Sequence, residues 1–98
     1  MKKEVHFLQP AATEMIAAAR YYESKVEGLG HRFLNEIEQV AASICGHPDA
    51  GVLVRGKVRR RLLHHFPFVL LYIEDSGTIE IVAVMDTRRK PDYWISRL

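Results

Sequence analysis

In the first half of the chain, apolar residues recur at helical spacing. Two stripes with apolar side chains every three or four positions predict a helix over residues 10–26 and a second helix that ends in residues 46–48. Residues 46–48 are Gly-His-Pro, and a glycine followed by a proline is a common helix stop. The stripes are Met15, Ala18, Ala19, Tyr22 and Val26, and then Phe33, Ile37, Val40, Ala41 and Ile44. The second helix leaves Arg32, Glu36 and Gln39 for solvent. The short link between the helices predicts an antiparallel hairpin.

The second half has short apolar runs separated by turn sequences. We expect strands over residues 5–8, 57–65, 68–74 and 78–85, and a short helical turn in the tail, residues 91–98. Asp75-Ser76-Gly77 favours a tight turn between the last two strands. The order β-α-α-β-β-β predicts an α+β fold, in which a mostly antiparallel, twisted sheet has the helical hairpin packed on one face. We expect one domain over residues 1–98.

Composition is ordinary for a globular protein. The chain has 98 residues, of which 48% are hydrophobic and 27% charged, so it can form one two-layer core. Its apolar runs are far shorter than the ~20 residues that cross a bilayer. Cys45 is the only cysteine and cannot form an internal disulfide, which is typical of a protein from a reducing compartment. We therefore expect a cytoplasmic protein that does not contact a membrane.

Charge is unevenly distributed. Residues 1–50 hold five Lys or Arg against seven Asp or Glu, whereas residues 51–98 hold nine against five. The excess lies in two clusters, Arg55 to Arg61 and Arg88 to Lys90. Segregated positive charge is typical of a protein that binds an acidic partner, either nucleic acid or an acidic protein segment, although a solvated basic face is the structural alternative.

The candidate contacts to a target or a phosphate group are Arg59, Arg61, Arg88, Arg89 and Tyr93. Arg59 and Arg61 share one strand face, because side chains alternate along a strand. The rival interpretation pairs them with Glu36 or Glu38 of the second helix. His64 and His65 alternate faces, and no metal-ligand spacing occurs, so we expect neither a metal nor a cofactor.

Three aromatic side chains have separate interpretations. Tyr22 lies on the core stripe, whereas Tyr21 points about 100° away from it and is available to a partner. Trp94 is expected to act as a hydrophobic lid on the core rather than as a contact to a target.

An ordered set of motifs runs through nearly the whole chain. In sequence order they are Tyr21-Tyr22-Glu23, Gly28-Leu29-Gly30, Arg32-Phe33-Leu34, Glu36-Ile37-Glu38, Pro48, Val58-Arg59-Arg60, Phe66-Pro67-Phe68, Leu71-Tyr72, Ile81-Val82-Ala83-Val84 and Arg88-Arg89-Lys90-Pro91-Asp92-Tyr93-Trp94. With this order of elements, the chain resembles the RelE/ParE toxin superfamily. The resemblance implies a growth-inhibiting toxin of a type II toxin–antitoxin module, of the kind associated with plasmid stabilization. A cognate antitoxin would neutralise it by covering an apolar groove beside the helical hairpin or an open sheet edge; the residues it would contact are not identified.

Two targets occur among relatives in this superfamily. RelE-like members cleave mRNA on the ribosome and often have an arginine after the aromatic residue that opens the third strand; here Phe68 is followed by Val69. Other cleaving members have a histidine at the end of the last strand, where this chain has Asp86. These departures, and two helices of about 17 residues, favour a ParE-like inhibitor of DNA gyrase without catalytic residues. The alternatives are a RelE-like mRNA endoribonuclease and a non-toxic module that binds nucleic acid or a partner.

Overall fold

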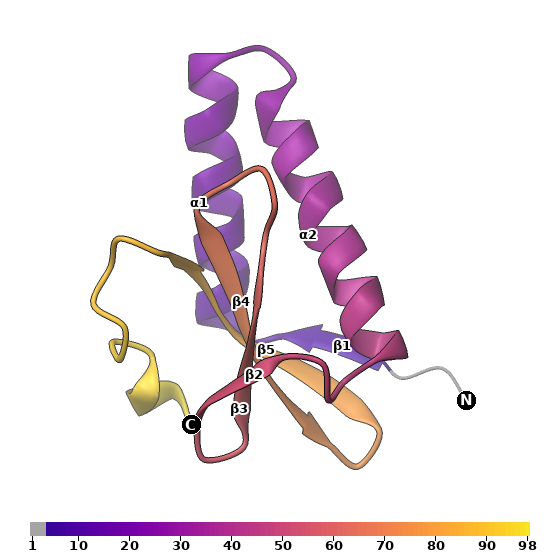
Figure 1. Ribbon diagram of the computed structural model, residues 1–98. Coiled ribbons are helices and arrows are strands. Elements are labelled where there is room, and N and C mark those ends of the chain that lie inside the picture. The colour runs from indigo at the N-terminus through magenta and orange to yellow at the C-terminus, as the bar shows by residue number, and fades with distance from the viewer. Residues whose placement is uncertain (1–3) are drawn as a thin grey trace.

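The computed structural model describes residues 4–98, which form two long helices and one five-stranded sheet. The elements are β1 (Glu4–Phe7), α1 (Gln9–Lys25), α2 (Leu29–Gly46), β2 (Val52–Arg55), β3 (Val58–Leu62), β4 (Phe68–Asp75), β5 (Thr78–Asp86) and a 3-10 turn (Ile95–Arg97). Figure 1 shows the two helices side by side as a hairpin, with the C-terminal segment on the other side of the strands from α2. Neither helix of the described chain has the length and apolar character needed to cross a membrane.

The sheet confirms the predicted α+β architecture. Its strand order is β1-β5-β4-β3-β2, and all neighbours are antiparallel except β1 and β5, which run parallel. β5 has a neighbour on each side, in agreement with its near-continuous apolar sequence. Ser76 and Gly77 both have positive φ, at 50° and 83°, so a two-residue turn joins β4 to β5 as expected.

Two boundaries in the basic region differ from the prediction. Residues 52–55 form an additional edge strand, β2, so the order is β-α-α-β-β-β-β; Gly56 turns the chain back into β3 at a φ of +54°. β3 ends at Leu62 instead of His65. The reason is that the carboxylate of Glu36 accepts hydrogen bonds from the backbone N–H groups of His64 and His65, which takes them out of the sheet ladder.

The helical hairpin is closed by Glu23. Its carboxylate accepts hydrogen bonds from the N–H groups of Gly28, at 2.8 Å, and Gly30, at 2.9 Å, and so satisfies donors at the start of α2. Gly28 has a φ of +84°, and a Cβ on Gly30 would lie 2.5 Å from the Ala19 carbonyl oxygen, so both positions require glycine. The prediction for Val26 was wrong: α1 ends at Lys25, and Val26 is extended and 56% exposed.

The main core lies between the sheet and the helices, on what we call the helix face. Phe33, Phe66, Phe68 and Tyr22 form an aromatic group with ring centroids 4.8–6.2 Å apart. The predicted α2 stripe is buried here in full. Glu36, predicted to face solvent, is only 7% exposed, because it follows Phe33 by three positions and precedes Val40 by four.

A β-bulge lets β5 serve two cores. The register skips Val82, so Leu71 pairs with Ala83 and Tyr72 with Ile81. As a result Ile79, Ile81 and Val84 all pack on the helix face. The opposite side, the outer face, has a second cluster formed by Val58, Val69, Leu71, Val82, Ala83 and Trp94. Trp94 is 2% exposed, so the tail covers this smaller core, which confirms its role as a lid.

Candidate interaction surfaces

The five predicted contact residues lie in two separate places. Arg59 and Arg61 of β3 point toward the end of α2 and the loop that follows it. Arg59 Nη1 donates hydrogen bonds to the carbonyl oxygens of Gly51, at 2.8 Å, and Asp49, at 3.2 Å. Arg61 Nη2 donates to Ser43 Oγ at 2.7 Å. The partners therefore differ from Glu36 and Glu38, which the rival interpretation named, but these contacts still favour a structural role for both arginines.

The loop beside these arginines is fixed by Tyr72 of β4. Its hydroxyl donates to the Pro48 carbonyl oxygen at 2.8 Å and accepts from the Gly51 N–H at 3.2 Å. A Cβ on Gly51 would lie 2.4 Å from that hydroxyl oxygen, so the loop approaches β4 too closely for any larger residue. Burial raises the pKa of Tyr72, and the phenol stays protonated as a donor.

Arg88 and Arg89 lie just after β5, and both side chains are mostly exposed. Arg88 forms a two-pronged ion pair with Asp86, in which Nε and Nη2 lie 3.0 and 2.7 Å from the two carboxylate oxygens. The side-chain hydrogen bond from Arg88 holds the pKa of Asp86 below its ordinary range. Asp86, which stands where other cleaving members of the superfamily have a histidine, is thus neutralised by a neighbouring guanidinium.

Tyr93 belongs to a group around Glu14, which we call the Glu14 cluster. Glu14 of α1 accepts hydrogen bonds from the Tyr93 hydroxyl, from both terminal nitrogens of Arg97, at 2.9 and 3.0 Å, and from the Val84 N–H at 3.0 Å. Arg97 Nη1 also donates to the Val82 carbonyl oxygen at 3.1 Å. The cluster therefore ties the tail to α1 and binds backbone groups of β5 beyond the end of β1.

Electrostatics within the Glu14 cluster follow from this geometry. Burial would raise the pKa of Glu14, but hydrogen bonds from Arg97, Tyr93 and the Val84 N–H outweigh it and hold the pKa below its ordinary value. Burial and the neighbouring carboxylate raise the pKa of Tyr93 well above its ordinary value. The guanidinium groups of Arg89 and Arg97 lie 4.0 and 5.0 Å from the Tyr93 ring centroid. Tyr93 is therefore a clasp for the tail in this structure.

Sequence reasoning missed Glu14 and Arg97. A signal for Glu14 was present, since it follows the buried Ala11 by three positions and precedes the buried Ala18 by four, and so shares their helix face. Arg97 carried no such signal, because its contacts to α1 and β5 depend on how the tail folds back.

A hollow of about 430 Å³ adjoins the Glu14 cluster. Tyr21, Tyr22, Arg88 and Arg89 are among its lining residues. Tyr21 is 57% exposed, in agreement with its predicted position off the core stripe, and its ring meets that of Tyr22 edge-on at 5.5 Å. This hollow brings an exposed aromatic side chain together with two cations.

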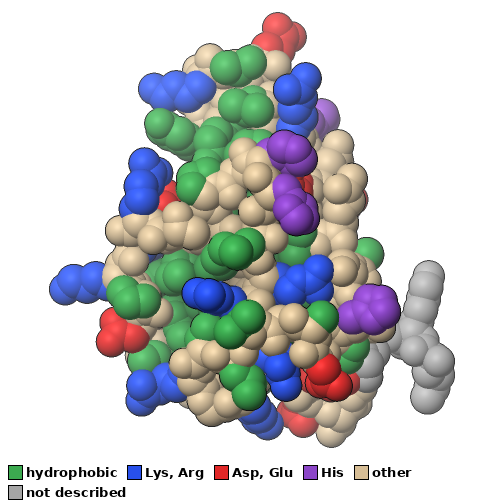
Figure 2. All heavy atoms as spheres, in the orientation of Figure 1, with side chains coloured by type: hydrophobic (Ala, Val, Ile, Leu, Met, Phe, Trp, Pro, Cys, Tyr) green, Lys and Arg blue, Asp and Glu red, His purple; other side chains and the backbone are tan. Residues whose placement is uncertain are grey.

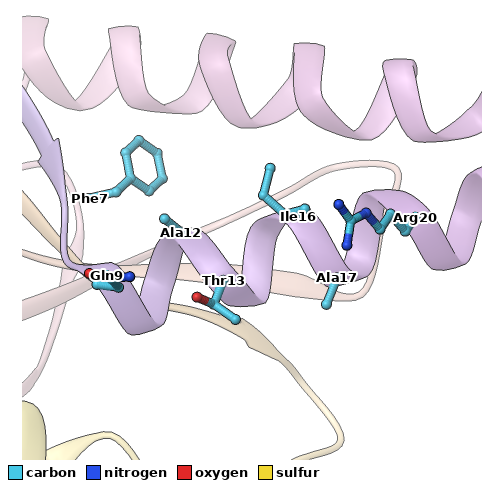
Figure 3. A pocket seen from close by; sticks show the side chains of 7 residues that line it. All are labelled: Phe7, Gln9, Ala12, Thr13, Ile16, Ala17 and Arg20. Atoms are coloured by element: carbon cyan, nitrogen blue, oxygen red, sulfur yellow. The ribbon is translucent and has the colours of Figure 1, made fainter.

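An apolar groove runs along the helical hairpin beside β1. Three adjoining hollows of about 640, 460 and 300 Å³ share Ile16 of α1, which is 41% exposed, and we call them together the hairpin groove. Figure 3 shows Phe7 of β1 and Ile16 on the side of α1 that faces α2, with Arg20 one turn further along. Leu34 of α2 lines the other wall. β1 beside the groove is an edge strand.

A family model describes these same elements. The model for the ParE toxin of the type II toxin–antitoxin system parDE matches residues 5–91, from β1 to the segment after β5. The chain belongs to the ParE toxin family. One chain of the solved chromosomal ParDE system from P. aeruginosa superposes on this ParE family toxin with a TM-score of 0.73 and 16% identity, covering 87% of this chain and 96% of the other. No curated protein sequence matches the chain.

This ParE family toxin shows no potential metal centre in the described residues. Across residues 4–98, no three His, Cys, Asp or Glu side chains lie close enough together to hold an ion. His65 Nδ1 lies 2.7 Å from a Glu36 oxygen, and Cys45 packs against the main core. His65 therefore helps to anchor the β3–β4 loop, and Cys45 contributes to packing of the main core.

Proposed function

We propose that this ParE family toxin stops growth by binding and inhibiting DNA gyrase in the cytoplasm, and that a cognate antitoxin neutralises it by covering the hairpin groove. The family assignment over residues 5–91 carries the proposal. Gyrase is the target implied by the resemblance to ParE-like members of the superfamily.

Two positions support a binder rather than an mRNA-cleaving enzyme. Val69 is buried in the outer-face cluster, so the position after Phe68 contributes packing instead of a phosphate-binding cation. Asp86 is occupied by Arg88. RNA cleavage by a neighbouring 2′-hydroxyl needs a base, an acid and cations around one phosphate. Tyr93, another of the predicted contacts, is held by Glu14 in the tail clasp.

The hairpin groove supports the site that we propose for the antitoxin. An amphipathic helix needs an apolar channel of this kind, and an extended segment needs an open strand edge. The groove supplies the channel through Phe7, Ile16 and Leu34, and β1 supplies the edge beside it. We propose Arg88 and Arg89, together with Tyr21, as target contacts, because they are exposed on a different part of the surface.

Two assays on the purified chain test the proposal. Gyrase supercoiling of relaxed plasmid DNA should be inhibited, and mRNA on ribosomes should remain uncut. Codon-periodic cuts without gyrase inhibition would establish the endoribonuclease alternative, and neither effect would leave a binding module.

Variants separate the two surfaces. Ile16→Asp should weaken rescue by the antitoxin gene product while gyrase inhibition persists, since a buried unpaired charge in an interface costs several kcal/mol. Arg89→Gln should weaken gyrase inhibition and leave rescue intact. Arg32→Gln, at an exposed position on α2, is the matched control for loss of a surface arginine and should change neither.

A further inference from the structure

The outer face of the sheet carries a groove that shares only Arg89 with the surfaces of the proposed function. It lies between the β2–β3 hairpin and the C-terminal tail and has a volume of about 440 Å³; we call it the outer-face groove. Figure 2 shows hydrophobic side chains gathered between these two segments, with Lys and Arg side chains over and around them. It is on the side of the sheet opposite the helix face, because its floor includes Val69 and Leu71 of the outer-face cluster.

The walls of this groove are apolar and open. Leu62 of β3 is 55% exposed and Val54 of β2 is also exposed, so neither is covered by the described chain. Met85 and Trp94 complete the apolar lining from the other side. Apolar side chains exposed around a concave site are typical of a surface that a partner's apolar side chains fill.

The rim of the groove is positive. Arg55 of β2, Arg60 of β3 and Arg89 line it, against a single carboxylate, Asp92. Arg55 and Arg60 are exposed and have no ion-pair partner among the residues that the structure describes. Arg60 points away from the helix face, unlike Arg59 and Arg61 next to it. Unpaired cations around an apolar floor complement a partner with carboxylates beside apolar side chains.

The same lining disfavours a single-stranded nucleic acid. Binding of bases relies on exposed aromatic faces for stacking. Trp94 is the aromatic residue of the groove, and it is almost completely buried. The nearby Tyr93 ring is already contacted by Arg89 and Arg97. An aliphatic floor with an arginine rim thus favours a peptide over RNA or DNA.

We infer that the outer-face groove is a second docking surface, which binds an acidic segment of a protein partner whose carboxylates alternate with apolar side chains. Its apolar side chains fill the space between Leu62 and Trp94, and its carboxylates pair with Arg55 and Arg60. Arg89 already lies 3.9 Å from a Glu14 carboxylate oxygen. Because the hairpin groove lies across the sheet, both surfaces can be occupied at once.

Fluorescence anisotropy with three labelled probes tests this inference on the full chain. The probes are a short peptide that alternates glutamate with leucine, the same peptide with lysine in place of glutamate, and a single-stranded RNA of similar length. The glutamate peptide should bind at least about tenfold more tightly than either of the others, and added salt should weaken it. Equal binding of the lysine peptide, or tighter binding of RNA, would overturn the inference.

Variants locate the binding. Arg60→Glu and Leu62→Asp should each weaken the glutamate peptide by about tenfold or more, whereas Ile16→Asp, in the hairpin groove, should leave it unchanged. Arg60 and Leu62 are exposed, and unchanged thermal unfolding of the two variants would show that the fold persists. Peptide binding that is unchanged in both Arg60→Glu and Leu62→Asp, or that is lost in Ile16→Asp, would also overturn the inference. Gyrase and antitoxin assays are not part of this test, so its failure leaves the proposed function standing.

Discussion

The two faces of the sheet differ in how they are covered. On the helix face, both helices pack over Leu70, Tyr72, Ile79 and Ile81, each of which is fully or almost fully buried. On the outer face, the tail covers the strands through Trp94, and exposed Val54 and Leu62 remain beside it. One face is therefore closed by two long elements, whereas the other is closed in part by a terminal segment held by the Glu14 cluster.

This difference suits the helix face to stabilising the fold and the outer face to binding a partner. A continuous, close-packed core leaves little room for a partner, because its side chains already interlock. A face covered by one short segment leaves apolar surface and charge accessible at its margin. The outer face therefore contributes less to the stability of the fold and carries the outer-face groove. Truncating side chains on each face shows how much each face contributes to stability.

The largest expected effect comes from the aromatic group on the helix face. Phe33→Ala should lower the free energy of unfolding by about 3–5 kcal/mol, because a fully buried ring is replaced by a cavity among Tyr22, Phe66 and Phe68. Trp94→Ala should cost only about 1–2 kcal/mol, since a terminal segment can open locally without unfolding the sheet. Denaturant unfolding measures both values, and an equal loss would show that the tail is an integral part of the core.

Acid sensitivity should come from two carboxylates, the buried Glu36 on α2 and the partly buried Glu14 on α1. Burial opposes ionisation of Glu36 too, but hydrogen bonds from the His65 side chain and from the N–H groups of His65 and His64 hold its pKa below the ordinary 4.5, as those around Glu14 do for its own pKa. A lowered pKa in the folded state stabilises it above pH 4.5, and this stability is lost as the pH falls below that value toward the folded-state pKa.

We therefore expect stability to decline below about pH 4.5, and Glu36→Ala to cost about 2 kcal/mol at pH 7 because it removes the charged acceptor of the His64 and His65 N–H groups in the β3–β4 loop. Glu14→Gln should flatten the pH dependence and increase hydrogen exchange of the tail more than of the sheet. Unfolding curves between pH 3 and 7, which bracket these values, compare the variants with the parent chain. Uniform exchange in Glu14→Gln would contradict the role of Glu14 as a clasp.

Local sequence patterns predicted the elements, and long-range contacts determined where the prediction was wrong. The α2 stripe and the Asp75-Ser76-Gly77 turn depend on neighbours in the chain, and both are confirmed. The end of β3 was predicted three residues too late because it depends on Glu36, 28 and 29 residues away from the two N–H groups that it binds. β2 was missed because all of its residues are exposed, so no burial pattern marks it.

The candidate surfaces were predictable in charge but not in pairing. The basic clusters in the sequence do supply Arg60 and Arg89 to the outer-face groove. Which arginines are free, however, depends on partners distant in sequence: Ser43 for Arg61 and the Gly51 carbonyl for Arg59. Alternation along the strand placed Arg60 on the opposite sheet face from Arg59 and Arg61. Which of the two faces the helices cover, however, could be determined only from the folded sheet.

A smaller change in stability is expected on the helix face, where the loop after α2 lies very close to β4. Gly51→Ala should destabilise the chain by about 1–2 kcal/mol, because its Cβ would come within 2.4 Å of the Tyr72 hydroxyl and 2.8 Å of the Arg60 carbonyl oxygen. Gly46→Ala is the matched control: it has no atom within 4 Å of the new Cβ and ends α2, so it should be neutral or stabilise by up to about 1 kcal/mol. Thermal unfolding ranks the two, and equal effects would exclude a close contact at Gly51.

The smallest expected effect compares adjacent arginines on the two faces of β3. Arg60→Gln should change stability by less than about 0.5 kcal/mol, because its side chain is exposed. Arg61→Gln should cost about 1 kcal/mol: it removes the hydrogen bond to Ser43, but it also removes Nη1, a buried nitrogen with no hydrogen-bond partner among the described residues, and the two contributions oppose each other. Denaturant unfolding measures both. A larger loss in Arg60→Gln than in Arg61→Gln would mean that the outer face depends on its rim for stability, and an arginine needed there could not serve as a free contact for a partner.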